Sequence, residues 1–95
     1  MIVTEHRREP RVEMDEVVFV QLLNPFSEER LAARVVNRST GGVCIASLTF
    51  LPRGGEVQVF HRGDQLFGKI RYCVPAKEGF RSGIAVSQII ATHHD

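Results

Sequence analysis

This chain of 95 residues contains short runs in which apolar residues recur at every second position, and turn-forming residues separate most of these runs. Six runs predict β-strands, at 12–23, 31–36, 43–48, 56–62, 66–74 and 80–88. Asparagine, proline and serine at 24–27 are typical of a turn, and 63–65 is a connection tight enough for a hairpin. Closure removes exposed strand edges, so the sequence predicts an all-β fold, a small six-stranded antiparallel barrel.

The alternation also predicts which side chains share a face of each strand. In the fifth run, Ile70, Tyr72 and Val74 are expected on one side, with Lys69 and Arg71 on the other. Most of the phenylalanines occupy plausible core positions as well. These assignments predict an interior built from both aliphatic and aromatic residues.

The chain has the length of one domain, 1–95. Residues 1–11 combine charge with a proline and lack a clear period, so we expect a flexible arm there. The barrel is expected to span 12–89, and 90–95 to form a short tail. No apolar run approaches the roughly 20 residues of a membrane span, and no signal peptide is visible. A cytoplasmic protein without membrane insertion is therefore expected.

Charge and aromatic content argue against a nucleic-acid-binding barrel. The net charge is only +1, whereas a general nucleic-acid binder carries a strong basic excess. A barrel that binds single strands also needs stacking platforms and a basic groove, and this chain has no tryptophan and one tyrosine. The positive charge is instead local, at Arg7, Arg8 and Arg11.

The sequence contains no recognisable catalytic or metal-binding constellation. None of the four histidines has a second ligand at metal spacing. Asp15 and Glu16 are adjacent on a predicted strand and point to opposite faces, so they do not form an acid–base pair by themselves. Cys44 and Cys73 each lie within a strand. A reduced pair is the preferred interpretation, with a disulfide as the alternative.

One segment near the start of the chain suits an anionic ligand. Arg7 and Arg11 supply two guanidinium forks, and such forks match phosphates and the acceptor edge of guanine. Pro10 keeps this stretch out of a helix. Arg8 lies between them and is a weaker candidate, because it could simply face solvent. Arginines near a terminus are often solvated, so this segment alone predicts little.

A second segment, 37–42, lies between two predicted strands. Asn37 supplies an amide and Ser39 a hydroxyl, which suit the polar edge of a base. Gly42 supplies conformational freedom or allows a ring to approach closely. The same residues could instead only stabilise a turn. Together the two segments predict a clamp for a small anionic nucleotide.

The pair of motifs resembles the signature of PilZ domains, the bacterial receptors for cyclic di-GMP. In that family Arg-x-x-x-Arg is followed by Asn/Asp-x-Ser-x-x-Gly, and the interval here leaves room for a long strand, a turn and a second strand. The later segment 83–86, Gly-Ile-Ala-Val, is similar to the closing strand of such barrels. The resemblance extends from about residue 5 to about residue 89.

The resemblance implies a PilZ-like split barrel that binds cyclic di-GMP through Arg7, Arg8, Arg11, Asn37, Ser39 and Gly42. It further implies a second-messenger receptor without a cofactor or enzymatic activity, which orders its N-terminal arm on binding and signals to a partner protein. The alternative is a PilZ-like protein-interaction module that does not bind the nucleotide, although such modules typically lack the motifs. The sequence does not identify the partner, or whether one or two ligand molecules bind.

Overall fold

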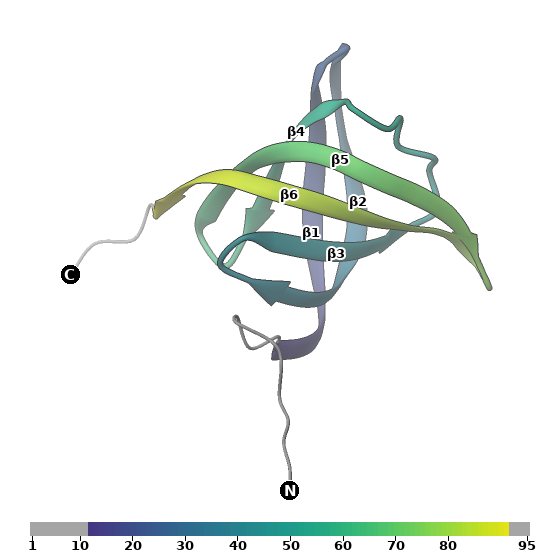
Figure 1. Ribbon diagram of the computed structural model, residues 1–95, viewed down its shortest axis with the longest axis horizontal. Coiled ribbons are helices and arrows are strands. Elements are labelled where there is room, and N and C mark those ends of the chain that lie inside the picture. The colour runs from purple at the N-terminus through teal and green to yellow at the C-terminus, as the bar shows by residue number, and fades with distance from the viewer. Residues whose placement is uncertain (1–11, 92–95) are drawn as a thin grey trace, which may run out of the picture.

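The computed structural model describes residues 12–91, whose backbone forms six strands and no helix (Figure 1). The strands are β1 (Val12–Asn24), β2 (Phe26–Ser39), β3 (Gly42–Ser47), β4 (Glu56–His61), β5 (Asp64–Ala76) and β6 (Gly79–Ala91). The arm expected at 1–11 lies outside the described residues. Over the described range, no helix is long and apolar enough to cross a membrane.

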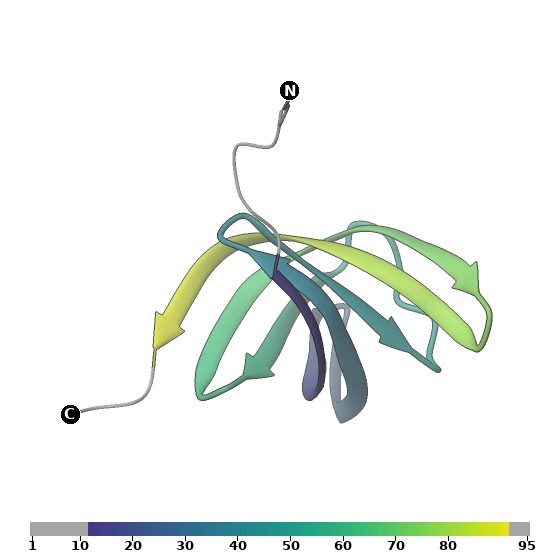
Figure 2. The same cartoon turned by 90° about the horizontal axis from the view of Figure 1, so that it is seen from below.

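The six strands close into a barrel in the order β1-β2-β3-β6-β5-β4, and every neighbouring pair is antiparallel. The pairing of β1 with β4, with Val20 opposite Val59, completes the closure. Figures 1 and 2 show the β1–β2 hairpin crossing the curved strands β3, β5 and β6 at a steep angle. The predicted six-stranded antiparallel barrel is confirmed.

Several strands are longer than the sequence indicated, because their hairpins stay paired closer to the turns. β2 begins at Phe26, which lies opposite Leu23, so only Pro25 separates β1 from β2. β6 continues to Ala91, which pairs with Asp64 and lies inside the segment expected to be a tail.

The β4–β5 connection also differs from the expected one at 63–65. The turn consists of Arg62 and Gly63, with φ angles of 55° and 81°, as a two-residue type I′ turn requires. Asp64 already belongs to β5. This tight turn brings Arg62 and Asp64 together at one end of the barrel, where the candidate site described below lies.

The core lies inside the barrel and is almost entirely aliphatic. It consists of Val18, Val20, Ala33, Val35, Val43, Ile45, Leu51, Val57, Val59, Leu66, Ile70 and Ile84. Leu51 is fully buried although it lies in the loop between β3 and β4. That loop is fastened to β5, since the Gly54 amide donates to the Ile70 carbonyl at 2.7 Å.

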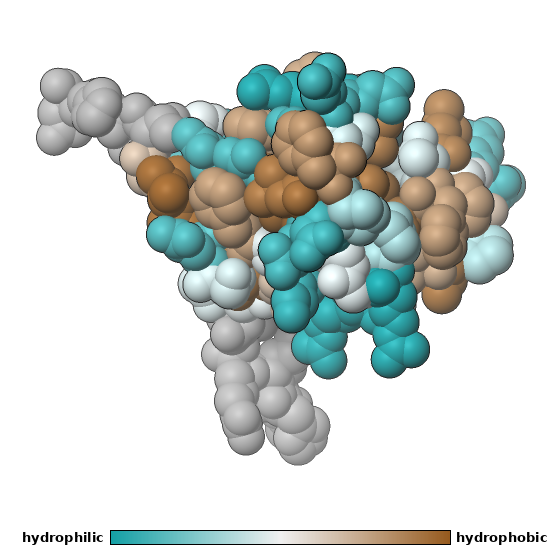
Figure 3. Space-filling view, turned by 90° about the horizontal axis from the view of Figure 1, so that it is seen from above, coloured by the Kyte–Doolittle hydropathy of each residue, from teal (hydrophilic) through white to brown (hydrophobic). Residues whose placement is uncertain are grey.

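The phenylalanines lie outside this core, so the expectation that most of them occupy core positions is wrong. Phe19, Phe26 and Phe50 are 47%, 66% and 55% exposed, and the other three are half-buried. Phe19 lies between the buried Val18 and Val20, so the alternation of β1 places its ring on the outer face. Figure 3 shows apolar residues grouped on the outer surface between hydrophilic ones. The scarcity of aromatic platforms is therefore no longer an argument against nucleic-acid binding, whereas the low net charge still is.

A β-bulge in β5 changes the predicted faces of that strand. Ile70 and Tyr72 pair with consecutive residues of β6, which leaves Arg71 as the extra residue. Beyond the bulge the alternation shifts by one. Tyr72 and Val74 are 44% and 45% exposed, and Cys73 packs against the core instead. The common face predicted for Ile70, Tyr72 and Val74 is therefore wrong.

Candidate functional site

A surface hollow of about 350 Å³ lies where the β2–β3 turn meets β5 and β6. Ser39 and residues 41–44 form one side of it, and Arg71 and Tyr72 of β5 form another. Residues 83–85 of β6 lie between these two sides, because β6 is placed between β3 and β5 in the barrel. The hollow thus combines a hydroxyl, backbone groups next to glycines, a guanidinium and an aromatic ring.

Two of the predicted binding residues line this hollow. Ser39 ends β2 and Gly42 begins β3, and they lie opposite each other in the β2–β3 pair. Asn37 lies two residues earlier on β2, half-buried and opposite Cys44 of β3. Asn37 is not among the residues that line the hollow. The fold therefore groups part of the second motif around one concave surface.

The predicted arginines, Arg7, Arg8 and Arg11, lie outside the described residues. The described chain begins with β1 at Val12, which directly follows Arg11 in the sequence. Val12 pairs with Arg38 of β2, the residue between the amide and the hydroxyl of the second motif. The start of β1 and the second motif therefore lie side by side.

Glycines at two positions allow close approach within the hollow. A Cβ on Gly42 would lie 3.2 Å from the carbonyl oxygen of Ile84, which is tighter than an ordinary contact. A Cβ on Gly83 would lie 2.2 Å from Cε2 of Tyr72, so only glycine permits the ring to lie there. Tyr72 and Gly83 are a cross-strand pair, and an aromatic ring that covers a glycine is a known stabilising arrangement in sheets.

Sequence reasoning missed Arg71 and Tyr72 as site residues. The bulge turns both of them outward, and Arg71 has no ion-pair partner among residues 12–91. The hydroxyl of Tyr72 lies 3.9 Å from Sγ of Cys44. One signal was available, since an isolated glycine in a strand, here Gly83, often marks a bulge or a close approach. That signal indicates an irregularity without saying which side chain it redirects.

The site offers little chemistry for metal binding or redox reactions. The described residues contain no group of three or more histidine, cysteine or acidic side chains able to hold a metal ion. Cys44 and Cys73 are free thiols, which confirms the reduced pair over the disulfide. The arrangement suits binding through hydrogen bonds, charge and stacking.

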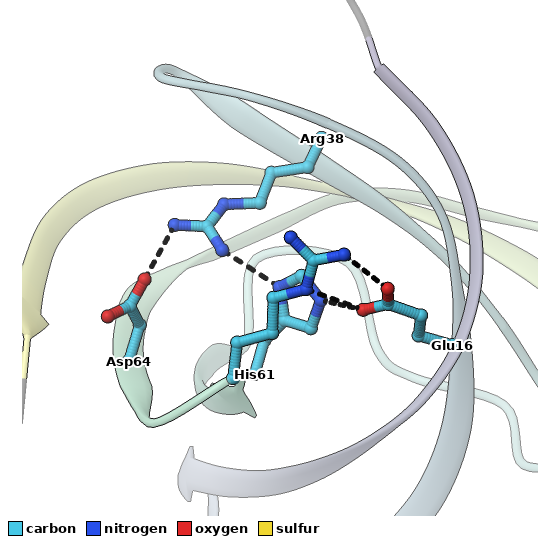
Figure 4. A network of polar contacts seen from close by, with 5 residues as sticks. Glu16, Arg38, His61 and Asp64 are labelled. Carbon is cyan, nitrogen blue, oxygen red and sulfur yellow. Dashed lines mark hydrogen bonds and ion pairs between the residues drawn. The ribbon is translucent and has the colours of Figure 1, made fainter. Parts of the chain in front are cut away.

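A network of five polar residues lies at the same end of the barrel (Figure 4). His61 is 3% exposed, and its Nε2 lies 2.7 Å from Oε1 of Glu16. Its Nδ1 lies 2.8 Å from Nη1 of Arg38, whose Nη2 donates to Oδ2 of Asp64 at 3.2 Å. Arg62 donates to both carboxylate oxygens of Glu16, from Nε at 2.9 Å and from Nη2. The network connects β1, β2 and the β4–β5 hairpin.

The network lowers the pKa of Glu16 to about 2, from an ordinary value of 4.5, mainly through hydrogen bonds from Arg62 and then from His61. The same pair raises the pKa of Arg62. Because the pKa of Glu16 is lower in the folded state, this carboxylate stabilises the folded state at pH values above its ordinary pKa of 4.5. The stabilisation is lost as the pH falls from there towards 2.

We therefore expect folding stability to fall between about pH 5 and pH 2 in part through Glu16. Near pH 3 the unfolded chain should hold about one more proton at this residue than the folded chain does. Urea unfolding of the wild type and of Glu16→Gln across this range would measure it, because the variant cannot titrate there. The variant should show a shallower fall. Parallel curves for the two proteins would contradict the assignment.

The comparisons with known proteins concern the fold alone. No protein-family model and no curated protein sequence matches this chain. A solved structure, the Bacillus subtilis inhibitor of motility MotI/DgrA, matches with a TM-score of 0.59 and 20% sequence identity. The match covers 93% of this chain and 45% of the Bacillus protein, so the chain spans less than half the length of that neighbour. The six-stranded barrel described above is a PilZ-like fold.

Proposed function

We propose that this chain is a bacterial PilZ-like receptor domain for cyclic di-GMP. The observation that carries the proposal is the register between β1 and β2, in which Val12 lies opposite Arg38. Because Arg11 precedes Val12 and Arg38 lies between Asn37 and Ser39, this register supports a single site shared by both motifs. Each motif alone has an ordinary structural explanation. An arginine motif that leads directly into β1, opposite the second motif, favours the receptor.

The proposed roles follow from the donor and acceptor chemistry of each residue. Arg7 and Arg11 bind phosphate oxygens and the N7 and O6 acceptors of guanine, with Arg8 as a weaker contributor. Asn37 and Ser39 hold the remaining polar edge of a guanine. Gly42 lets the ligand approach the barrel wall, where a side chain would already crowd β6. No metal ion or cofactor takes part in this scheme.

Arg71 and Tyr72 extend the site across the hollow. The ring of Tyr72 lies against Gly83, which fixes its position, and it borders the hollow that Ser39 and Gly42 also line. A guanine base stacked on such a ring contributes about 1–3 kcal/mol to binding. The guanidinium of Arg71 supplies a further positive charge for a dianionic ligand.

The output of the receptor is a changed surface for a partner protein. Binding through Arg7 and Arg11 orders the segment 1–11 against the barrel, which costs about 1–2 kcal/mol for each residue ordered. Charge-assisted hydrogen bonds of about 1.5–3 kcal/mol each offset this cost. The fold neighbour in Bacillus subtilis is an inhibitor of motility, and a regulatory role exerted through a partner agrees with that description. The receptor is expected to act in the cytoplasm and without catalysis.

Calorimetric titration of the purified chain with cyclic di-GMP tests the proposal, with GMP as the control ligand. Saturable binding in the micromolar range or tighter is expected, about −8 kcal/mol or more favourable, with much weaker binding of GMP. No heat of binding for cyclic di-GMP at protein concentrations of about 100 µM would reject the receptor. It would favour the alternative of a PilZ-like protein-interaction module that does not bind the nucleotide.

The single tyrosine makes the stacking role directly measurable. The chain has no tryptophan, so its intrinsic fluorescence reports on Tyr72. Cyclic di-GMP is expected to quench this emission with the same midpoint as the calorimetric binding curve. Tyr72→Leu should weaken binding by about 1–3 kcal/mol, while Tyr72→Phe, which keeps the ring, should stay close to the wild type. Tight binding without quenching, together with an unaffected Tyr72→Leu, would place the base elsewhere.

A further inference from the structure

The geometry around His61 defines the tautomer of its buried imidazole. A guanidinium only donates hydrogen bonds, so Nδ1 of His61 must accept from Nη1 of Arg38, at 2.8 Å. The proton of the neutral ring is then on Nε2, which donates to Oε1 of Glu16 at 2.7 Å. Protonation of Nδ1 would place two donors opposite each other and remove the bond between His61 and Arg38.

The charges around the ring also balance only when the imidazole is neutral. Glu16 faces it from β1, Arg38 from β2, Arg62 from the β4–β5 turn, and Asp64 from β5 (Figure 4). Two carboxylates and two guanidinium groups sum to zero. A protonated His61 would add a positive charge at a position that is 3% exposed and next to the guanidinium of Arg38.

Arg38 connects this network to the candidate nucleotide site. It occupies the position between Asn37 and Ser39 on β2, and successive side chains of a strand point to opposite faces. Ser39 lines the hollow, whereas the guanidinium of Arg38 is bonded to His61 and Asp64, and the Arg38 side chain is only 18% exposed. Because the Arg38 side chain is held on one face of β2, the end of this strand cannot twist about its own axis. The side chains of Asn37 and Ser39 are thereby kept on the opposite face.

We propose that Arg38 and His61 form a positioning pair for the nucleotide site. This proposal rests on the proposed function above. The imidazole holds Arg38, and Arg38 holds β2 so that Asn37 and Ser39 face the ligand. Loss of the bond between His61 and Arg38 loosens the end of β2 and weakens binding of cyclic di-GMP, although neither Arg38 nor His61 contacts the ligand.

The test is the affinity for cyclic di-GMP at pH 8 for the wild type, His61→Gln, Arg38→Met and Arg38→Lys. A glutamine amide supplies both an acceptor and a donor, so it can replace both hydrogen bonds of the neutral ring. His61→Gln should therefore keep most of the affinity.

Arg38→Met removes the donor to His61 and should bind about tenfold more weakly, and Arg38→Lys should recover part of the loss. All titrations are made where circular dichroism shows the variant folded, so a purely structural role would lower the melting temperature and leave affinity unchanged. Wild-type affinity in Arg38→Met, or a loss of about tenfold in His61→Gln, would overturn the proposal.

A measurement without ligand separates this inference from the proposed function. Nitrogen-15 NMR of the imidazoles should show His61 as the neutral Nε2–H tautomer at pH 8, with Nδ1 accepting a hydrogen bond. That signature should change in Arg38→Met. If the tautomer is as expected but the wild type does not bind cyclic di-GMP, the receptor fails and the coupling to it fails with it. If the wild type binds but His61 is the Nδ1–H tautomer, only the positioning pair is rejected.

Discussion

Replacing Arg7 or Arg11 with alanine is expected to weaken cyclic di-GMP binding by about 2–4 kcal/mol, or about 30- to 1,000-fold. Each guanidinium offers a planar pair of N–H donors to a phosphate or a guanine, and charge-assisted hydrogen bonds are about twice as strong as neutral ones. Folding should survive, because the core of the described chain begins at Val18. Calorimetric titration together with a thermal melt of each variant measures both quantities.

Arg53→Ala is the matched control for these two variants. It removes the same charge from an exposed position in the loop between β3 and β4, which belongs to neither motif. Its affinity should remain within about twofold of the wild type, since an exposed charge without a direct contact to the ligand contributes little. Equal losses in all three variants would indicate a general electrostatic effect, and unchanged binding in Arg7→Ala or Arg11→Ala would remove that arginine from the site. Arg8→Ala is expected to fall between the control and the motif variants.

The fold could be predicted from the sequence because each strand has its own local signals. Alternation at Val57 and Val59 marks interior positions without reference to any other strand, and both residues are fully buried. The phenylalanines were assigned wrongly because hydrophobicity alone does not decide which face of a strand a residue occupies. Phe19 lies between the buried Val18 and Val20 and therefore on the outer face of β1.

The sequence predicted only the part of the candidate site that is formed by residues close to one another in the chain. Ser39 and Gly42 are three residues apart, and a single β-turn brings them to the same hollow. Tyr72 reaches that hollow through a bulge, an insertion that no residue of β5 announces and that reverses the expected face. His61 had no sequence neighbour of functional interest, because its partners come from strands that only barrel closure brings together.

Gly68→Ala is expected to lower the free energy of unfolding by about 3 kcal/mol, because the added methyl group obstructs the pairing of β5 with β6. These two strands carry one side of the hollow. A Cβ at this position would lie 2.1 Å from the carbonyl oxygen of Ala85 and 2.9 Å from its carbonyl carbon. Both are backbone atoms of β6, so relief requires that the two strands separate. For a domain of this size the melting temperature should fall by roughly 10–20 °C. Chemical and thermal unfolding, each followed by circular dichroism, would measure the loss.

Gly54→Ala separates this steric effect from the general cost of replacing glycine. Gly54 has a φ of 85°, which disfavours any side chain, yet no atom lies within 4 Å of a Cβ placed there. Its substitution should therefore cost only the conformational penalty of about 1–2 kcal/mol. Gly68 has no such φ, so a larger loss at Gly68 than at Gly54 must come from the contact between β5 and β6. Equal losses would mean that β5 and β6 can move apart cheaply, and the rigid placement of Tyr72 against Gly83 would then lose its structural basis.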